Sequence, residues 1–472
     1  MSPSPSAAPA SPRRAVVLGA GVAGLFAAKV LSTAYDEVVV VDRDVLDATD
    51  GPRRAVPQGR HIHGLLARGH AIIERLFPGI TDELAAEGVP VGDFGTSLRW
   101  WFDGRPMKQE HAGLVAVSAA RPHLEQRVRA RLRDDATVRF VEGTDIVGLV
   151  TDAPSDAEPH GRVRGVRLQR IGDAEASQVG ADLVVDATGR GSRMPGWLLE
   201  LGAAEVETER ITIDLTYTTC DFARPLSVDP IGDGIAEVCV ATTALPRGAT
   251  LARLRDRYSL SLYGFHGDRP PTDLEGFLAF ARTLPVPVIH DAVAGAVPMS
   301  EPTSFTFPAN VRRRFERSRD LPPGLLAVGD AVCAFNPIYA QGMTVAAIGA
   351  DVLASHVGRG REPEPRAFFR DLGKAVDAPW ALATAGDLAH PRTKGERTLA
   401  VKVVNAYLDR LRPAAAEDAV LARAFLRVAG LVDPPPAIMR PRVLVRVLAA
   451  AFRGRPPEPS AAVGSSPVST GR

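Results

Sequence analysis

The fold is decided by the stretch Ala15–Asp42, which reads AVVLGAGVAGLFAAKVLSTAYDEVVVVD. Its apolar start, Ala15–Leu18, is typical of a buried strand. A helix is predicted from the glycines that follow through about Leu31, and Val38–Val41 has the composition of a second strand. The stretch therefore predicts a strand–helix–strand unit at the start of an α/β fold.

Three glycines form a complete G-x-G-x-x-G motif between the first strand and the helix. Gly19 permits a tight turn, Gly21 lets a pyrophosphate approach the backbone, and Gly24 lets helix and strand pack closely. The helix N-terminus offers unpaired N–H groups and a partial positive charge to phosphates. Asp42 lies about 20 residues further on, where an acidic side chain bonds ribose hydroxyls. These features predict a site for an adenine dinucleotide; the alternative is a glycine-rich turn in another α/β protein.

The composition is that of a globular protein. The chain has 472 residues, 45% hydrophobic and 24% charged, a length that suggests two or three domains. A net charge of +1 gives no indication of a nucleic-acid partner. The three cysteines have neither paired nor metal-type spacing, and no apolar run is typical of a signal peptide or a membrane span. We therefore expect a cytoplasmic protein.

The order of the patterns predicts a Rossmann-type domain interrupted by an antiparallel β-sheet domain. Residues from Arg210 to Phe265 form short segments rich in Val, Ile, Thr and Tyr, and a buried strand of the parallel type returns at Leu325–Asp330. We expect disordered tails at 1–13 and 455–472, a discontinuous nucleotide-binding domain at 14–95, 112–200 and 318–375, a β-rich substrate domain at 96–111 and 201–317, and a helical C-terminal region at 376–454.

Two further motifs follow predicted strands. Asp186–Ser192 reads DATGRGS, and Gly329–Met343 reads GDAVCAFNPIYAQGM. Together with the first motif they resemble the FAD-dependent class A monooxygenases of the para-hydroxybenzoate hydroxylase type. Arg53–Leu66, RRAVPQGRHIHGLL, and Ala120–Glu125, ARPHLE, resemble most a branch of polyether olefin epoxidases, with squalene epoxidase more distant. The resemblance covers most of residues 14–375.

The resemblance implies FAD as the cofactor and a set of residues that bind it. Asp330, at the end of a strand, can accept hydrogen bonds from ribityl hydroxyls, and Pro337 stiffens the connection near the ring. A helix that starts at Gly342 directs its N–H groups toward the flavin N1–C2=O, where negative charge develops on reduction. Arg121 is expected at the ribityl or phosphate region; the alternative is a surface arginine. The expected FAD contacts are Gly19, Gly21, Gly24, Asp42, Arg43, Arg121, Gly189, Gly329, Asp330, Pro337, Gly342 and Met343.

The cluster Arg60-His61-Ile62-His63 is the remaining polar candidate. Its His-x-His spacing can place two imidazoles on one face of a strand, as in some metal sites. No acidic residue or cysteine with ligand spacing accompanies it, so we predict no metal. The resemblance places this stretch beside the flavin ring, which makes Arg60, His61 and His63 candidates for flavin or substrate contact. The alternative is a pair of structural histidines in a loop.

The resemblance also implies the reaction. One oxygen atom of O2 would pass, by way of a flavin C4a-hydroperoxide, to a largely apolar polyketide- or terpenoid-like small molecule, by epoxidation or hydroxylation. NAD(P)H would supply electrons, directly or through a partner flavin reductase, since the sequence has no second G-x-G-x-x-G. Alternatives are an FAD-dependent reductase of an unsaturated lipid-like substrate and a non-catalytic flavin-binding protein. Expected pocket walls are Trp100, Trp101, Tyr217, Tyr263 and Phe265.

The C-terminal segment Pro441–Arg453 is predicted to form a basic amphipathic helix. Such a helix can lie on a membrane surface or a carrier protein, or pack on its own domain, and we favour the last. We therefore expect at most a peripheral membrane contact.

Overall fold

A five-stranded parallel sheet is built around the first strand of the chain. The computed structural model describes residues 12–46, 51–54, 56–224 and 229–452. The expected tails, except for residues 12 and 13, lie outside these residues. The strand order is β17-β11-β1-β2-β7, and all neighbours are parallel. The strands are β1 (Arg14–Leu18), β2 (Glu37–Val41), β7 (Val138–Val141), β11 (Leu183–Asp186) and β17 (Leu325–Ala327).

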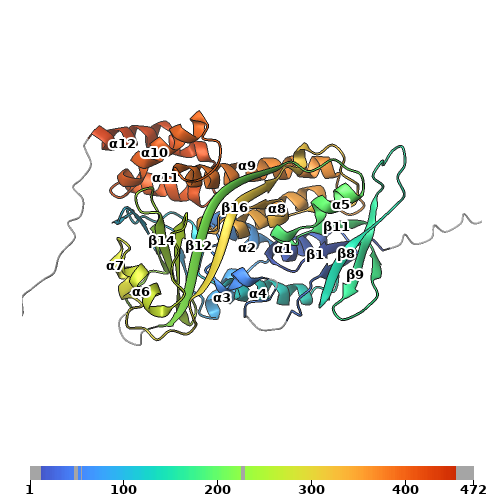
Figure 1. Ribbon diagram of the computed structural model, residues 1–472, viewed down its shortest axis with the longest axis horizontal. Coiled ribbons are helices and arrows are strands. Elements are labelled where there is room, and N and C mark those ends of the chain that lie inside the picture. Colours follow the sequence, from blue (N-terminus) through green and yellow to red (C-terminus); the bar gives the residue numbers. More distant parts are fainter. Residues whose placement is uncertain (1–11, 47–50, 55, 225–228, 453–472) are drawn as a thin grey trace, which may run out of the picture.

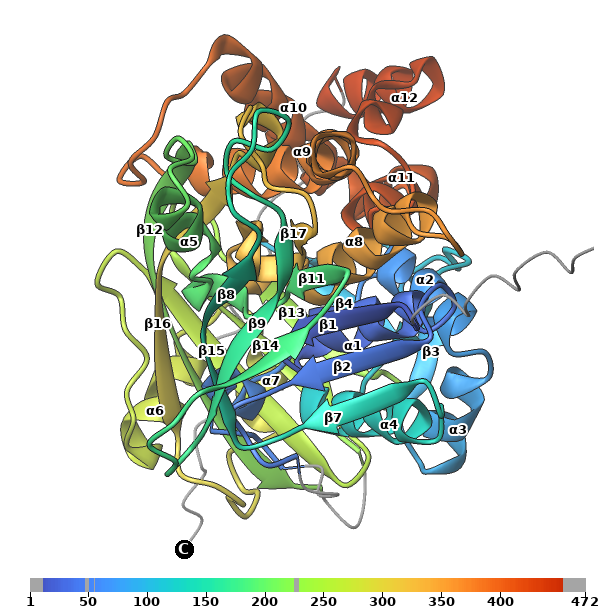
Figure 2. The same cartoon turned by 90° about the vertical axis from the view of Figure 1, so that its right-hand side faces the viewer.

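The central strands of this sheet consist almost entirely of buried apolar residues, as strands covered on both faces require. α1 packs on β1, β2 and β11, and it also contacts α4 and α8. The three-stranded antiparallel sheet β10-β9-β8 contacts β11 and β2 (Figures 1 and 2). The bounds are α1 (Val22–Leu31), α4 (Arg121–Arg133), α8 (Gly342–His356), β8 (Thr144–Thr151), β9 (Val163–Arg170) and β10 (Ser177–Gly180).

An eight-stranded sheet forms the second unit, and the long strands β12 and β16 lie side by side near one edge of it (Figure 1). Its order is β18-β16-β12-β15-β14-β13-β4-β5, antiparallel except for the parallel pair β13–β4. The strands are β4 (Leu98–Phe102), β5 (Arg105–Pro106), β12 (Thr208–Ala223), β13 (Ala236–Val240), β14 (Arg247–Arg253), β15 (Arg257–Phe265), β16 (Thr303–Arg313) and β18 (Cys333–Ala334). The predicted α/β fold with an inserted antiparallel sheet is therefore confirmed.

One strand of the large sheet comes from the third sequence motif. β18 pairs with β16 through Val311 and Ala334. The residues that follow β18 therefore leave the edge of the large sheet and lead directly into α8. This connection ties the third motif to both sheets.

Several helices cover the sheets and form the C-terminal region. α6 and α7 pack against β15 and β14, whereas α10, α11 and α12 pack on one another above the large sheet (Figure 1). The bounds are α2 (Ala67–Leu76), α3 (Ile80–Ala86), α5 (Met194–Glu200), α6 (Leu274–Arg282), α7 (Pro287–Asp291), α9 (Pro365–Ala389), α10 (Leu399–Ala415), α11 (Ala419–Ala429) and α12 (Pro441–Phe452). The shorter elements are β3 (Val91–Asp93), β6 (Val115–Val117), η1 (Pro57–Arg60), η2 (Gly189–Gly191), η3 (Phe315–Arg317), η4 (Gly329–Ala331), η5 (Pro337–Tyr339) and η6 (Pro435–Met439).

The C-terminal helices are part of the main core. α12 buries Val443 and Val447 against its neighbours, and Arg446 forms an ion pair of 2.7 Å with Asp418 at the start of α11. The boundary expected between residues 375 and 376 falls inside α9, which is continuous from 365 to 389. Among the described residues, no helix combines the length and apolar character needed to cross a membrane.

Candidate functional site

In the turn after β1, Gly19 and Gly24 occupy positions at which a side chain would clash with the backbone. Gly19 has φ +97°, and a Cβ added there would lie 2.8 Å from the carbonyl oxygen of Ala187. A Cβ on Gly24 would lie 1.8 Å from the carbonyl oxygen of Gly19. Gly21 precedes α1 without a side-chain cap, so no side chain occupies the N–H groups of the first turn. The turn leaves the positive end of α1 open to an anion.

The three sequence motifs meet at the carboxyl ends of β1, β11 and β17. Gly329 has φ +63°, and a Cβ added there would lie 2.6 Å from the Cβ of Ala23 on α1. Gly189 has φ +77°, and its added Cβ would lie 3.9 Å from the Cβ of Asp330. In open α/β sheets this edge is where ligands bind. Segments more than 100 residues apart thus form one site.

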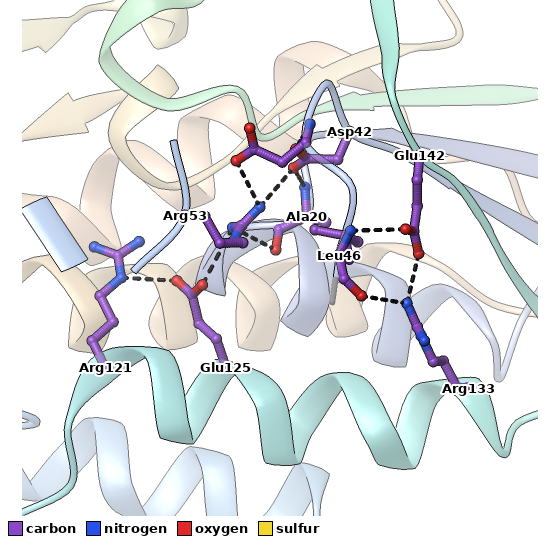
Figure 3. A network of polar contacts seen from close by, with 9 residues as sticks. Ala20, Asp42, Leu46, Arg53, Arg121, Glu125, Arg133 and Glu142 are labelled. Carbon is purple, nitrogen blue, oxygen red and sulfur yellow. Dashed lines mark hydrogen bonds and ion pairs between the residues drawn. The ribbon is translucent and has the colours of Figure 1, made fainter. Parts of the chain in front are cut away.

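A buried network centred on Arg53 holds the turn in place (Figure 3). Asp42 accepts hydrogen bonds at Oδ2 from the backbone N–H of Ala20 (2.6 Å) and from Arg53 Nη1 (3.3 Å). Arg53 Nη2 donates to the carbonyl of Ala20 (3.1 Å) and to Glu125 Oε2 (3.2 Å). Asp42 Oδ1 accepts from the N–H of Asp44 (2.9 Å) and keeps a further lone pair for another donor, such as a ribose hydroxyl.

Arg121, the first residue of α4, extends this network to the open end of α1 (Figure 3). Its Nε donates to Glu125 Oε1 (2.8 Å), and its Nη1 lies 3.3 Å from His63 Nε2. A Cβ added to Gly21 would lie 3.9 Å from Arg121 Nη2. Burial raises the pKa of Glu125, but Arg121 and Arg53 outweigh this effect and hold the pKa below its ordinary value. A guanidinium and a helix N-terminus therefore face the same point, as phosphate binding requires.

Asp330 lies close to three arginines. Burial raises the pKa of its carboxyl, and the positive charges of Arg121, Arg190 and Arg313 oppose that rise. Arg313 Nη1 donates to the backbone carbonyls of Asp330 (3.3 Å) and Ala331 (2.8 Å), which fixes η4. Among the residues that the structure describes, no donor forms a hydrogen bond to the carboxylate of Asp330, so this carboxylate can accept one from a ligand hydroxyl.

The histidine stretch lies against the start of α8. A Cβ added to Gly64 would lie 2.5 Å from the Cβ of Ala340, and the N–H of Leu66 donates to Thr344 Oγ1 (3.0 Å). His63 and Met343 line the same small apolar cavity. α8 begins at Gly342 without a side-chain cap, and a Cβ added to Gly342 would meet no atom within 4 Å. Open space thus remains at the positive end of this helix.

His61 connects the motif region to an aromatic cluster on the large sheet. Its Nδ1 lies 2.8 Å from Thr219 Oγ1, and its ring meets the ring of Tyr217 edge-on at 4.5 Å. Burial and the charge of Arg60 lower the pKa of His61 to about 4. Burial and Arg121 lower the pKa of His63 to about 3. Both imidazoles are therefore neutral near pH 7.

We define the aromatic cluster by its buried members and the side chains packed on them. It lies on one face of β12, β15 and β16 and includes a residue of η5, so it adjoins the third motif. The cluster consists of Ile213, Leu215, Tyr217, Tyr263, Phe265 and Phe307, with Ile211, Ala241, Phe305 and Ile338 packed against them.

The structure brings most of the residues expected from the sequence together, with four exceptions. Arg43 is exposed and pairs with Asp145 (3.5 Å), and Arg60 is exposed at the end of η1. Trp101 donates from Nε1 to Glu237 (2.6 Å) in the core beside α6 and α7, whereas Trp100 packs against the main core. Tyr217, Tyr263 and Phe265 share the aromatic cluster.

Sequence reasoning missed Arg53, Glu125, Arg190 and Arg313 as individual site residues. Arg53 lies in an irregular segment without periodicity, and the other three are distant from it along the chain. The signal for three of them was the position of Arg53, Glu125 and Arg190 inside the stretches that carried the resemblance. Their partners become visible only when the folded chain places them side by side.

The residues present fit an adenine dinucleotide that carries a flavin. The uncapped turn and Arg121 match a pyrophosphate, Asp42 and Asp330 match hydroxyl groups, and the open start of α8 matches a carbonyl edge. In the part of the chain that the structure describes, no group of three or more His, Cys, Asp or Glu side chains is arranged to hold a metal ion.

Comparisons with known proteins agree with this fold. No protein-family model matches the sequence. The chain is 32% identical over 444 residues to protein Rv3254 of Mycobacterium tuberculosis, with 89% of this chain and 90% of that protein covered. A flavoprotein/dehydrogenase of Cytophaga hutchinsonii aligns with a TM-score of 0.65 and 13% identity, over 93% of this chain and 98% of that one. PqsL, a probable FAD-dependent monooxygenase of Pseudomonas aeruginosa, aligns with a TM-score of 0.55 and 18% identity, over 88% and 99%.

Proposed function

The chain belongs to the family of protein Rv3254, and from that premise and the geometry of the site we propose that it is an FAD-dependent monooxygenase. It inserts one oxygen atom from O2 into a largely apolar, polyketide- or terpenoid-like small molecule, by epoxidation or hydroxylation. The observation that carries the proposal is the meeting of three motifs at one sheet edge, with the aromatic cluster beside them. The site can hold a flavin and present an apolar compound to it.

The chain's own residues bind and orient the cofactor. The backbone after Gly19 and the guanidinium of Arg121 hold the pyrophosphate, while Asp42 and Asp330 accept bonds from sugar and ribityl hydroxyls. The uncapped N-terminus of α8 would stabilise negative charge on a flavin bound there. When bound and reduced, FAD supplies the reaction with O2. Electrons come from NAD(P)H, directly or through a partner flavin reductase.

The remaining residues orient the substrate and exclude water. The aromatic cluster offers an apolar wall, and the ring of His61 packs edge-on against Tyr217 of this wall. Because the pKa of His61 is about 4, this imidazole is neutral at pH 7 and holds a hydrogen bond to Thr219 rather than a charge. An uncharged wall would favour apolar substrates and exclude water from the space beside the bound cofactor.

The first test concerns the cofactor site. We expect Asp330→Ala to weaken FAD binding about tenfold, because a hydrogen bond from a hydroxyl to a charged acceptor contributes roughly 1.5–3 kcal/mol. The measurement is equilibrium titration of the purified apoprotein with FAD, followed by flavin fluorescence. Asp320→Ala, in an exposed loop before β17, is the matched control and should bind FAD as the wild type does. Equal affinity in both variants would remove Asp330 from the site.

The second test concerns the reaction. The FAD-loaded protein is photoreduced without oxygen and then mixed with aerated buffer in a stopped-flow spectrometer. A transient absorbance that precedes the spectrum of oxidised flavin supports oxygen activation, and one labelled oxygen atom from ¹⁸O2 in the product formed from an olefinic substrate identifies a monooxygenase. Direct return to oxidised flavin, with substrate-dependent electron flow and no label, would instead indicate a reductase of unsaturated compounds. A protein that takes up no FAD would exclude both.

A further inference from the structure

A buried carboxylate lies directly behind the third motif. Asp387 on α9 is only 3% exposed and accepts three hydrogen bonds. Asn310 Nδ2 donates to its Oδ2 (2.6 Å), and Asn336 Nδ2 donates to its Oδ1 (2.7 Å). The hydroxyl of Tyr339 also donates to Oδ1 (3.0 Å). These bonds join α9, β16 and the turn of η5.

The two amides in this cluster are fixed as donors toward Asp387. Asn310 Oδ1 accepts a hydrogen bond from the backbone N–H of Asn336 (2.5 Å), and Asn336 Oδ1 accepts from the N–H of Ile338 (3.2 Å). Neither amide can rotate by 180° without breaking a bond to the backbone. Tyr339 is the remaining partner, and its hydroxyl can rotate to donate or accept. A Cβ added to Gly386 would lie 2.5 Å from this hydroxyl, so the glycine leaves room for it.

We propose that Asp387 is a positioning residue for the flavin site: its ionised carboxylate holds the 336–339 turn in place, and its protonation loosens that turn and weakens the site. The turn contains Pro337, joins β18 to α8, and places Ile338 on the aromatic cluster. Any displacement of the turn therefore moves both the start of α8 and part of the apolar wall. This inference rests on the proposed function and adds a regulation of the same site by pH.

The titration of this cluster falls in an accessible pH range. Burial raises the pKa of Asp387 to about 6, although the bonds from Asn310, Asn336 and Tyr339 oppose the rise. Protonation adds an O–H where both fixed amides can only donate, so the Tyr339 oxygen must turn to accept it. The other charged and titratable groups that face Tyr339 are Arg412 from α10 and Tyr263 from β15.

The experiment measures the dissociation constant of FAD for the full chain between pH 5.0 and 8.0. We expect wild type to bind FAD about fivefold more weakly at pH 5.0 than at pH 7.5, the factor that corresponds to the loss of one net hydrogen bond. Asp387→Asn carries an N–H where the protonated acid carries its O–H. This variant should show the weaker affinity at every pH, with a flat profile. Asp320→Asn, the same change at an exposed site, should follow wild type.

A second variant keeps the test decisive if Asp387→Asn does not fold. Tyr339→Phe removes one donor from the carboxylate, so the pKa of Asp387 should rise and the midpoint of the affinity profile should move upward by about half a pH unit or more. Identical pH profiles of FAD binding in wild type and in the folded variants would overturn the inference while the proposed function stands. Absence of FAD binding at every pH would overturn the proposed function and the inference with it.

Discussion

At the scale of single residues, His61 makes folding depend on pH. Its pKa is about 4 in the folded protein and about 6.5 in an unfolded chain, so the unfolded state binds more protons between these values. Stability is therefore lost as pH falls from about 6.5 to about 4, by up to about 3 kcal/mol. Urea unfolding at pH 7.0 and pH 4.5 should show a smaller loss for His61→Gln than for wild type.

The exposed His111 supplies the control for this prediction, since His111→Gln should lose as much stability as wild type does. Asp387 changes the folding stability with pH in the opposite direction. Because its pKa is raised to about 6 by burial, the folded state binds more protons between pH 4 and 6, and its contribution to stability falls as pH rises through that range. A greater loss in His61→Gln than in wild type would contradict a neutral buried imidazole.

At the scale of elements, the close approach of η4 to α1 aligns the first and third motifs. Gly329→Ala would place a methyl group 2.6 Å from Ala23 Cβ at a φ of +63°. The change therefore adds a steric clash to backbone strain, and we expect a loss of about 2–3 kcal/mol in unfolding free energy together with weaker FAD binding. Gly360→Ala is the matched control: it has φ +76° but no atom within 4 Å of the added Cβ, and should cost only about 1 kcal/mol. Equal losses in the two variants would show that the clash is relieved.

Local sequence patterns predict some elements of the site, but not the contacts between residues that are distant in the chain. The strands, the glycine turns and the start of α8 follow from patterns within about ten residues, and the structure has them at the expected positions. Neighbouring residues on a strand point to opposite faces, so Trp100 and Trp101 could not both line one pocket, and that signal was present in the sequence. The partners of Arg53 and Asp387 lie up to 77 residues away in the chain. No local pattern predicts such contacts.

At the scale of the whole molecule, one core joins the nucleotide-binding unit to the C-terminal helices. Its buried members run from Ala15 to Val447. Phe425 of α11 meets Phe102 of β4 edge-on at 5.5 Å, and the N–H of Arg68 donates to the carbonyl of Gly430 (3.1 Å). Units that share a core unfold together, since removal of one exposes the apolar surface of the others.

We therefore expect a single cooperative unfolding transition, with the same midpoint by tryptophan fluorescence and by far-ultraviolet circular dichroism. Phe425→Ala should lower that common midpoint, because it removes an aromatic pair worth roughly 1 kcal/mol in addition to its buried area. If the C-terminal helices formed an independent domain, the variant would instead unfold in two transitions. The helical signal in circular dichroism would then fall before the tryptophan fluorescence changed. Coincident curves in wild type and variant mean that α10, α11 and α12 stabilise the whole fold, including the strands that position the flavin site.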